Sequence, residues 1–97
     1  DRSVMREREM LSQDGIVLLN LVMDQRSGDL KDIEIISRGF MTPTESEELF
    51  NDLQARIGKL AKHANGRLQQ DVSKLAKSYL YEETKRRPVV FVNVSRN

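Results

Sequence analysis

The chain has 97 residues, a net charge of +1, one histidine and no cysteine. This length suffices for one domain with a single layer-on-layer core. The lack of cysteine excludes disulfides and thiolate metal sites, and the near-zero charge gives no general attraction to nucleic acid. No apolar run approaches the roughly 20 residues that a membrane-spanning helix needs, so we expect no membrane partner.

The first 13 residues carry dense mixed charge, with apolar residues such as Met5 and Leu11 interleaved. These apolar residues would have few partners within so short a chain. We therefore expect residues 1–13 to be a connector from an upstream module and residues 14–97 to form the domain. Because the chain begins with Asp1 and not with methionine, we expect a fragment or a processed chain.

Two apolar segments predict an antiparallel hairpin. Ile16–Met23 has apolar residues on both faces, and Asn20 is its only polar member. This pattern is typical of a central strand, or of a strand whose second face is covered by a partner. A turn-rich segment containing Gly28 follows, and a second strand is predicted over residues 30–40.

Two helices are predicted next. Thr42 and Glu45 have the spacing of a capping box at the start of the first helix. The second helix carries one apolar stripe, and Asp71 would start it if residues 67–70 form a loop. Pro88 ends this second helix.

A last strand is predicted from Val89 to Val94. The element order β-β-α-α-β predicts an α+β fold, with a small three-stranded mixed sheet in the order 2-1-3. A two-helix hairpin would cover one face of this sheet. The first strand is the most apolar, which favours the central position, and the helix pair would return the chain so that the last strand runs parallel to the first.

No residues have the spacing of a catalytic or metal-binding site. His63 lies near a helix end, where a surface imidazole suits the helix dipole. The acids around the hairpin turn do not fit a calcium loop, because Arg26 stands at a ligand position. No phosphate-binding glycine loop is present. We therefore predict no catalytic residue, no metal ligand and no cofactor in this chain.

Basic residues are the remaining candidates for ligand contact. Those that would contact RNA phosphates or serve a structural role are Arg38, Lys77, Lys85, Arg86 and Arg87. Of the two, the interaction of basic side chains with the helix dipole is the favoured explanation for the basic helix end. Arg38, which ends an apolar strand, would pair with an acid across an interface or hold carbonyl groups at a turn.

Four strings in the chain resemble the C-terminal domain of ribonuclease J, in the bacterial and plastid branch of the metallo-β-lactamase/β-CASP nucleases. The strings are Leu11–Val17, Ile35–Phe40, Ser46–Leu49 and Tyr79–Pro88. They occur in order and at fitting spacing over nearly the whole chain. The resemblance implies a small sheet packed by two helices, in agreement with the fold predicted from the residues.

The resemblance also implies a function for the parent protein. Members of this family degrade and mature RNA as 5′-to-3′ exonucleases and endonucleases, in the bacterial cytoplasm or in plastids. Two zinc ions activate the attacking water, and their ligands belong to the upstream catalytic module. The implied role of this chain is to pack against that module and to support homodimerisation, without activity of its own. RNA would be a partner through the parent enzyme.

Two functional interpretations follow, of which we favour the first. In the first, the chain is an accessory, dimer-forming domain of a ribonuclease, and the contact lies on the sheet face without helices, near Leu18, Asn20 and Phe91. In the second, it is a stand-alone RNA-binding module that uses its basic patch. An independent enzyme is disfavoured because the sequence offers no catalytic constellation.

Overall fold

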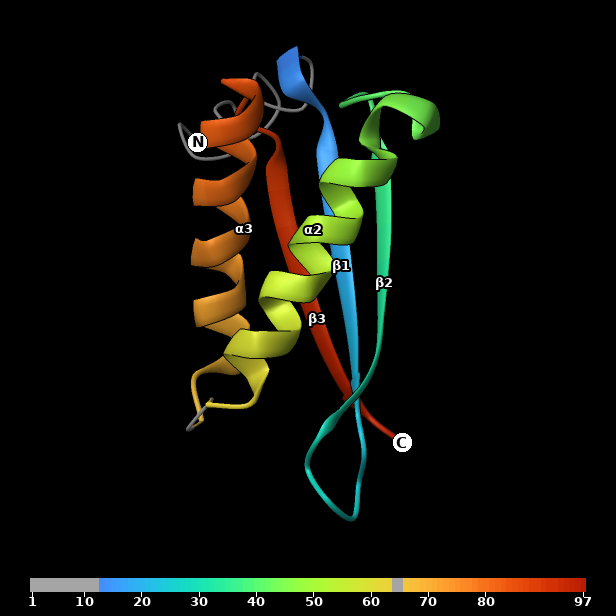
Figure 1. The fold of residues 1–97 in the computed structure, drawn as a ribbon, viewed down its shortest axis with the longest axis vertical. Helices are drawn as coiled ribbons and strands as arrows, with labels where there is room; N and C mark the ends of the chain where they lie inside the picture. Colours follow the sequence, from blue (N-terminus) through green and yellow to red (C-terminus); the bar gives the residue numbers. More distant parts are fainter. Residues whose placement is uncertain (1–12, 64–65) are drawn as a thin grey trace, which may run out of the picture.

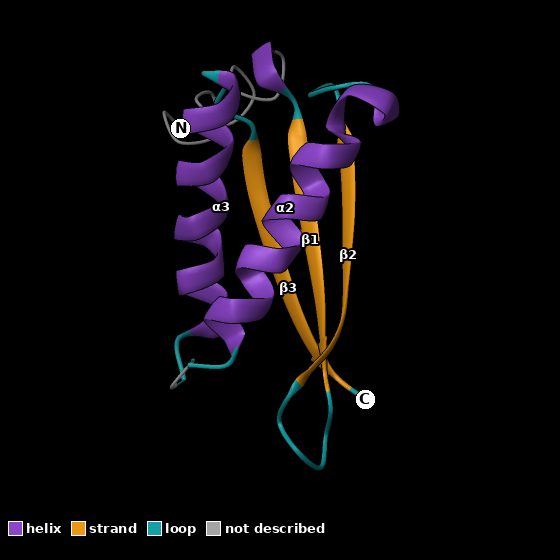
Figure 2. Ribbon diagram, in the orientation of Figure 1, coloured by secondary structure: helices purple, strands orange, loops and turns teal. Residues whose placement is uncertain are grey.

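The computed structural model describes residues 13–63 and 66–97. The elements in chain order are β1 (Ile16–Met23), β2 (Leu30–Arg38), α2 (Pro43–Ala61), α3 (Leu68–Thr84) and β3 (Val89–Arg96). The strands form one sheet in the order β2-β1-β3. β1 is antiparallel to β2 and parallel to β3. Both helices lie on the same side of the sheet (Figures 1 and 2), so the predicted α+β fold and strand order are confirmed.

Three predicted boundaries are corrected. β2 ends at Arg38 and not at residue 40, because Gly39 adopts a φ of 72° and turns the chain, and Phe40 enters the core. α3 begins at Leu68 and not at Asp71, which lies within its first turn. β3 continues two residues beyond Val94, since its pairing with β1 extends that far. The predicted connector lies outside the described residues except for Gln13.

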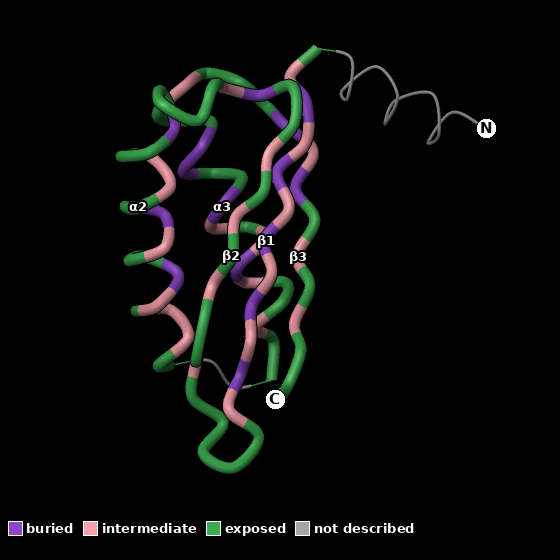
Figure 3. The backbone as a smooth tube through the Cα atoms, turned by 90° about the vertical axis from the view of Figure 1, so that its right-hand side faces the viewer, coloured by how far each residue is buried: buried purple, intermediate pink, exposed green. Residues whose placement is uncertain are grey.

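The core lies between the sheet and the two helices (Figure 3). Side chains alternate along β1, so that Val17, Leu19 and Leu21 are fully buried under the helices. The helices contribute the fully buried side chains of Leu53, Ile57, Val72, Ala76 and Leu80. The alternate residues of β1 are only half-buried, because they point to the face on which neither α2 nor α3 lies.

The capping box at the start of α2 forms as predicted. The backbone amide of Glu45 donates to Oγ1 of Thr42 at 3.3 Å, and the amide of Thr42 donates to Oε2 of Glu45, also at 3.3 Å. This cap stabilises the helix by about 1 kcal/mol. It starts α2 directly after the buried Phe40, whose ring stacks on that of Phe50 with centroids 6.3 Å apart.

Candidate functional site

The helix-free face of the sheet carries a row of apolar side chains. Leu18 lies at the centre of this row, opposite Ile36 of β2 and Phe91 of β3. Ile36 is 41% exposed and Phe91 is 51% exposed, although both are large apolar residues. We call this row, together with its flanking residues on the same side, the uncovered face. A cluster of this kind marks an interaction surface more often than scattered apolar residues do.

Asn20 ends the apolar row on one side. It lies opposite Asn93 of β3, whose Nδ2 donates to Oδ1 of Asn20 at 2.8 Å. The structure therefore brings the three predicted contact residues onto one face, with the amide pair at its polar margin. Sequence reasoning missed Ile36, which alternation along β2 would have assigned to this face beside Glu34.

The two ends of the uncovered face carry opposite charges. Arg38 lies opposite Ile16 at one end, and Glu34 and Asp32 follow along β2 toward the other end. Within the described residues, Arg38 makes no ion pair and no side-chain hydrogen bond. Its assignment to an interface or to a structural role therefore stays a prediction.

Three of the other four basic candidates lie around Tyr81, and the fourth, Arg86, is used in a contact of its own. Arg86 has a structural contact, since its Nη1 donates to the carbonyl of Phe40 at 2.6 Å. Lys85 caps α3 in the left-handed conformation, with φ of 58°. The guanidinium of Arg87 lies 4.4 Å from the centroid of the Tyr81 ring, and Nζ of Lys85 lies 5.3 Å from it. Lys77, Tyr81 and Arg87 line the same pocket.

The charge environment of Tyr81 follows from these contacts. Hydrogen bonding with Arg87 lowers the pKa of Tyr81, and the charges of Arg87 and Lys85 lower it further. Arg87 thus contributes a backbone anchor and a cation held against the Tyr81 ring, because its amide donates to Oδ2 of Asp14 at 2.7 Å while its side chain packs on the tyrosine.

Three of the resembling strings meet at one corner of the sheet. Gly15 lies so close to the turn after β2 that a Cβ on it would come 2.2 Å from the carbonyl oxygen of Arg38. The amide of Val89 donates to the carbonyl of Gly15 at 2.9 Å. Together with the Arg86–Phe40 contact, these bonds tie the starts of β1 and β3 to the end of β2. At this corner the residues of the strings therefore hold the three strands in position, and their contacts are structural.

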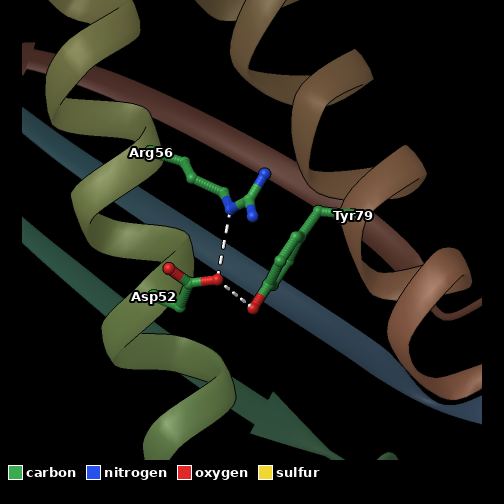
Figure 4. A network of polar contacts seen from close by, with 3 residues as sticks. All are labelled: Asp52, Arg56 and Tyr79. Carbon is green, nitrogen blue, oxygen red and sulfur yellow. Dashed lines mark hydrogen bonds and ion pairs between the residues drawn. The ribbon is translucent and has the colours of Figure 1, made fainter.

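A polar network joins the two helices (Figure 4). The hydroxyl of Tyr79 on α3 donates to Oδ2 of Asp52 on α2 at 2.5 Å, and Nε of Arg56 donates to the same oxygen at 3.1 Å. The Arg56 guanidinium also lies 4.6 Å from the Tyr79 ring centroid. Sequence reasoning placed Tyr79 on the apolar stripe but missed its partner.

The pKa shifts in this network agree with a structural role. Burial and the Asp52 hydrogen bond raise the pKa of Tyr79 to about 12. The hydrogen bonds from Tyr79 and Arg56 lower the pKa of Asp52. Both groups are held in their neutral-pH protonation states, which suits a clamp and not a group that exchanges protons near pH 7.

The acids near the hairpin do not form a metal centre. Within residues 13–63 and 66–97, no three His, Cys, Asp or Glu side chains lie close enough to hold an ion. Asp24 instead accepts hydrogen bonds from the backbone amides of Ser27 at 3.1 Å and Arg26 at 2.7 Å, and these bonds lower its pKa.

Among the described helices, none combines the length and apolar character needed to cross a membrane.

The fold and its surfaces define a small α+β domain that has a tied structural corner and an uncovered apolar sheet face. A sequence model of the family described as the ribonuclease J C-terminal domain matches residues 3–97. The chain therefore belongs to the ribonuclease J C-terminal domain family, and the resemblance carried by the four strings is confirmed.

Similar proteins are found among bacterial ribonucleases. The chain is 33% identical over 95 residues to Ribonuclease J2 of Bacillus subtilis (strain 168), a match that covers 90% of this chain and 17% of that protein. It is 29% identical over 100 residues to Ribonuclease J 2 of Staphylococcus epidermidis (strain ATCC 12228), covering 95% and 18%. Against Ribonuclease J 2 of Staphylococcus aureus (strain NCTC 8325) the identity is 27% over 100 residues. The chain spans less than a fifth of the length of these relatives.

Proposed function

We propose that this chain is the accessory domain through which a ribonuclease forms homodimers, and that two copies meet by their uncovered faces. The observation that carries the proposal is the Ile36–Leu18–Phe91 row, which lies on the central strand and both its neighbours and which neither α2 nor α3 covers. Burying such a row against an identical row removes apolar surface from water on both sides. Aromatic residues such as Phe91 are also enriched at the centres of interfaces.

The charges flanking the row make the face self-complementary. Along β2, Arg38 and Glu34 lie two positions from Ile36 in opposite directions. Two-fold contacts are the commonest in homo-oligomers, and each residue pair then occurs twice. An axis in the interface plane, perpendicular to the strands and through the Ile36 row, would place Arg38 of one copy against Glu34 of the other.

For the parent protein, we propose a zinc-dependent 5′-to-3′ exo- and endoribonuclease of RNA decay and maturation. Family membership supports this proposal. The donor set of the described residues does not fit a zinc site, because no three ligands converge. We therefore assign the metal and the hydrolytic step to an upstream catalytic module, which would also be a packing partner. Since the relatives reported above are bacterial, we propose the bacterial cytoplasm as the location and not a plastid.

The proposal is tested by light scattering on the 97-residue chain after size-exclusion chromatography. Wild type is expected to elute with twice the monomer mass, whereas Leu18→Asp and Phe91→Asp are expected to elute as folded monomers. Ala55→Asp introduces the same charge on the exposed surface of α2 and is expected to remain dimeric. If Leu18→Asp and Phe91→Asp fold and self-associate like wild type, the uncovered face is not the dimer contact.

A further inference from the structure

α3 lies beside the edge strand β3 (Figure 1), and two pockets lie along this seam, which together we call the α3–β3 groove. One pocket, of about 490 Å³, includes Tyr81 and Arg87 in its lining. A second pocket, of about 500 Å³, includes Lys74. The two pockets adjoin, because Lys77 and Val90 belong to both linings. Each pocket lies within the size range of small-molecule sites.

The groove is basic although the chain as a whole is nearly neutral. Lys74, Lys77 and Arg87 line it, and none of the described residues in the two linings is acidic. α3 does carry acids, such as Asp71 and Glu82, but these are not among the lining residues. The acidic and basic side chains of α3 thus lie on different sides, so that the charged side chains that line the groove are all basic. This concentrates positive potential locally.

An aromatic side chain lies among these cations. Tyr81 is 37% exposed, and it is one of the few large apolar or aromatic residues that the fold leaves accessible. Lys74, Lys77 and Tyr81 lie on one helical face, at spacings of three and four residues. They therefore span about 10 Å along α3. The floor beneath them is apolar and includes Pro88 and Val90.

We propose that the α3–β3 groove binds single-stranded RNA, with Lys74, Lys77 and Arg87 contacting phosphates and the Tyr81 ring stacking on a base. Proteins that bind single strands without sequence preference combine a cationic groove with aromatic platforms in this way. Arg87 contributes twice, because its guanidinium lies over one face of the Tyr81 ring and there supplies both a cation and a planar group on which a base can stack. The site adjoins the proposed dimer contact at Phe91, which belongs to the lining of the second pocket, but its cations and Tyr81 lie outside the apolar row.

RNA is a better occupant than a peptide strand added to the edge of β3. Strand addition needs free backbone groups along the edge. Nε2 of Gln69 already donates to the carbonyl of Val92 at 2.7 Å, which occupies an acceptor in the middle of β3. The combination of cations with an aromatic ring also matches a nucleotide, which offers a phosphate and a base together. The chain moreover belongs to a ribonuclease family, whose substrate provides such strands.

The test measures fluorescence anisotropy of a labelled oligouridylate with the 97-residue chain in the presence of EDTA. Lys74→Gln/Lys77→Gln is expected to weaken binding about tenfold and to reduce the salt slope by about 1.4, or about 0.7 for each lost phosphate contact. Tyr81→Leu is expected to weaken binding about 5- to 100-fold, whereas Tyr81→Phe retains a stacking ring and binds like wild type. Lys59→Gln/Lys62→Gln makes the same charge change at the exposed C-terminal end of α2, where Lys62 is the C-cap, and leaves binding unchanged.

Three results would overturn the inference. The first is no saturable binding of the oligouridylate by the folded wild type. The second is an equal loss of affinity in the α2 control, which would mean that net charge and not the groove attracts RNA. The third is evidence of a general polyanion site, which would be either Tyr81→Leu binding like wild type or polyglutamate displacing the RNA at equal charge concentration. None of these results bears on self-association, so the dimer proposal is tested separately.

Discussion

The two faces of β1 differ in what the fold does with similar residues. Leu19 is fully buried under both helices, whereas its neighbour Leu18 is only half-buried on the uncovered face. Both are leucines of one central strand, and both lie between apolar neighbours on β2 and β3. The apolar residues on the covered face are explained by the core of this chain, to which they belong. The apolar row on the other face has no such explanation among residues 13–63 and 66–97, which is why we assign it to a second molecule.

The same comparison separates residues that hold the fold from residues that are available for contacts. The corner around Gly15, the covered face of β1 and the helix clamp of Asp52 and Tyr79 all make internal contacts. The uncovered face and the α3–β3 groove do not need their exposed side chains for folding. Substitutions in the first group should change stability, and those in the second should change association.

The largest effect is expected at the corner. Gly15→Ala would force a Cβ to within 2.2 Å of the Arg38 carbonyl oxygen at a φ of +78°. We expect a loss of about 2–5 kcal/mol in the free energy of unfolding, measured by urea denaturation. Gly28→Ala is the matched control, because Gly28 has the same φ of +78° but nothing within 4 Å of the added Cβ. It should cost about 1–2 kcal/mol. Equal losses in the two variants would contradict the close approach at the corner.

The paired leucines test the difference between the faces directly. Leu19→Ala removes a fully buried side chain and should lower the free energy of unfolding by about 2–5 kcal/mol. Leu18→Ala should cost about 1 kcal/mol or less in the monomer. Chemical denaturation at low protein concentration gives both values. Similar losses for both leucines would show that the uncovered face also contributes to the core.

The helix clamp should have an intermediate effect that depends on pH. Tyr79→Phe removes the hydrogen bond to Asp52 and should cost about 1 kcal/mol at neutral pH. Since burial and Asp52 raise the pKa of Tyr79 from 10.0 to about 12, its contribution to stability is complete below pH 10 and is lost as the pH rises toward 12.

Asp52 has the opposite dependence. The lowered pKa of Asp52 means that its contribution is present above pH 3.8 and is lost as the pH falls below that value. Because the contribution of Tyr79 is lost at high pH, the stability curves of wild type and Tyr79→Phe should converge there. These curves are measured by urea denaturation as a function of pH. Curves that stay parallel between pH 10 and 12 would show that Tyr79 is not linked to folding in this way.

The smallest effect is expected for the charges that flank the apolar row. Arg38→Glu or Glu34→Lys alone would place like charges opposite each other in the proposed dimer and weaken it by about 1 kcal/mol at each contact. The double variant Arg38→Glu/Glu34→Lys restores opposite charges and should recover the affinity. Sedimentation equilibrium at low salt measures all three. A double variant that is weaker than either single one would exclude the two-fold arrangement that we propose.

Local signals predicted most of the fold. The capping box of Thr42 and Glu45 and the apolar strand with residues on both faces led to the correct elements and strand order. Contacts between distant residues were not predictable in this way. Arg86 and Phe40 are 46 residues apart, and Tyr79 and Asp52 are 27 apart. Their partners become visible only once the elements are packed, because no spacing rule links them.

The uncovered face and the basic groove were predicted only in part, because local patterns do not show which distant residues come together. Leu18, Asn20 and Phe91 were assigned to one face from strand alternation, and the structure places them there. Ile36 was missed because the alternation of side chains along β2 was not used to assign them to the two faces of the sheet. The basic residues were treated as one patch, but folding assigns Arg86 to an internal contact.

The measurement that tests the central claim most directly is a dilution series of methyl NMR spectra of the wild-type chain. If two copies meet by the uncovered face, the methyl resonances of Leu18 and Ile36 should move with protein concentration, while those of the buried Leu19 and Leu53 should stay in place. Resonances of Leu18 and Ile36 that do not move over the concentration range, or shifts confined to the helices, would contradict our account of the uncovered face.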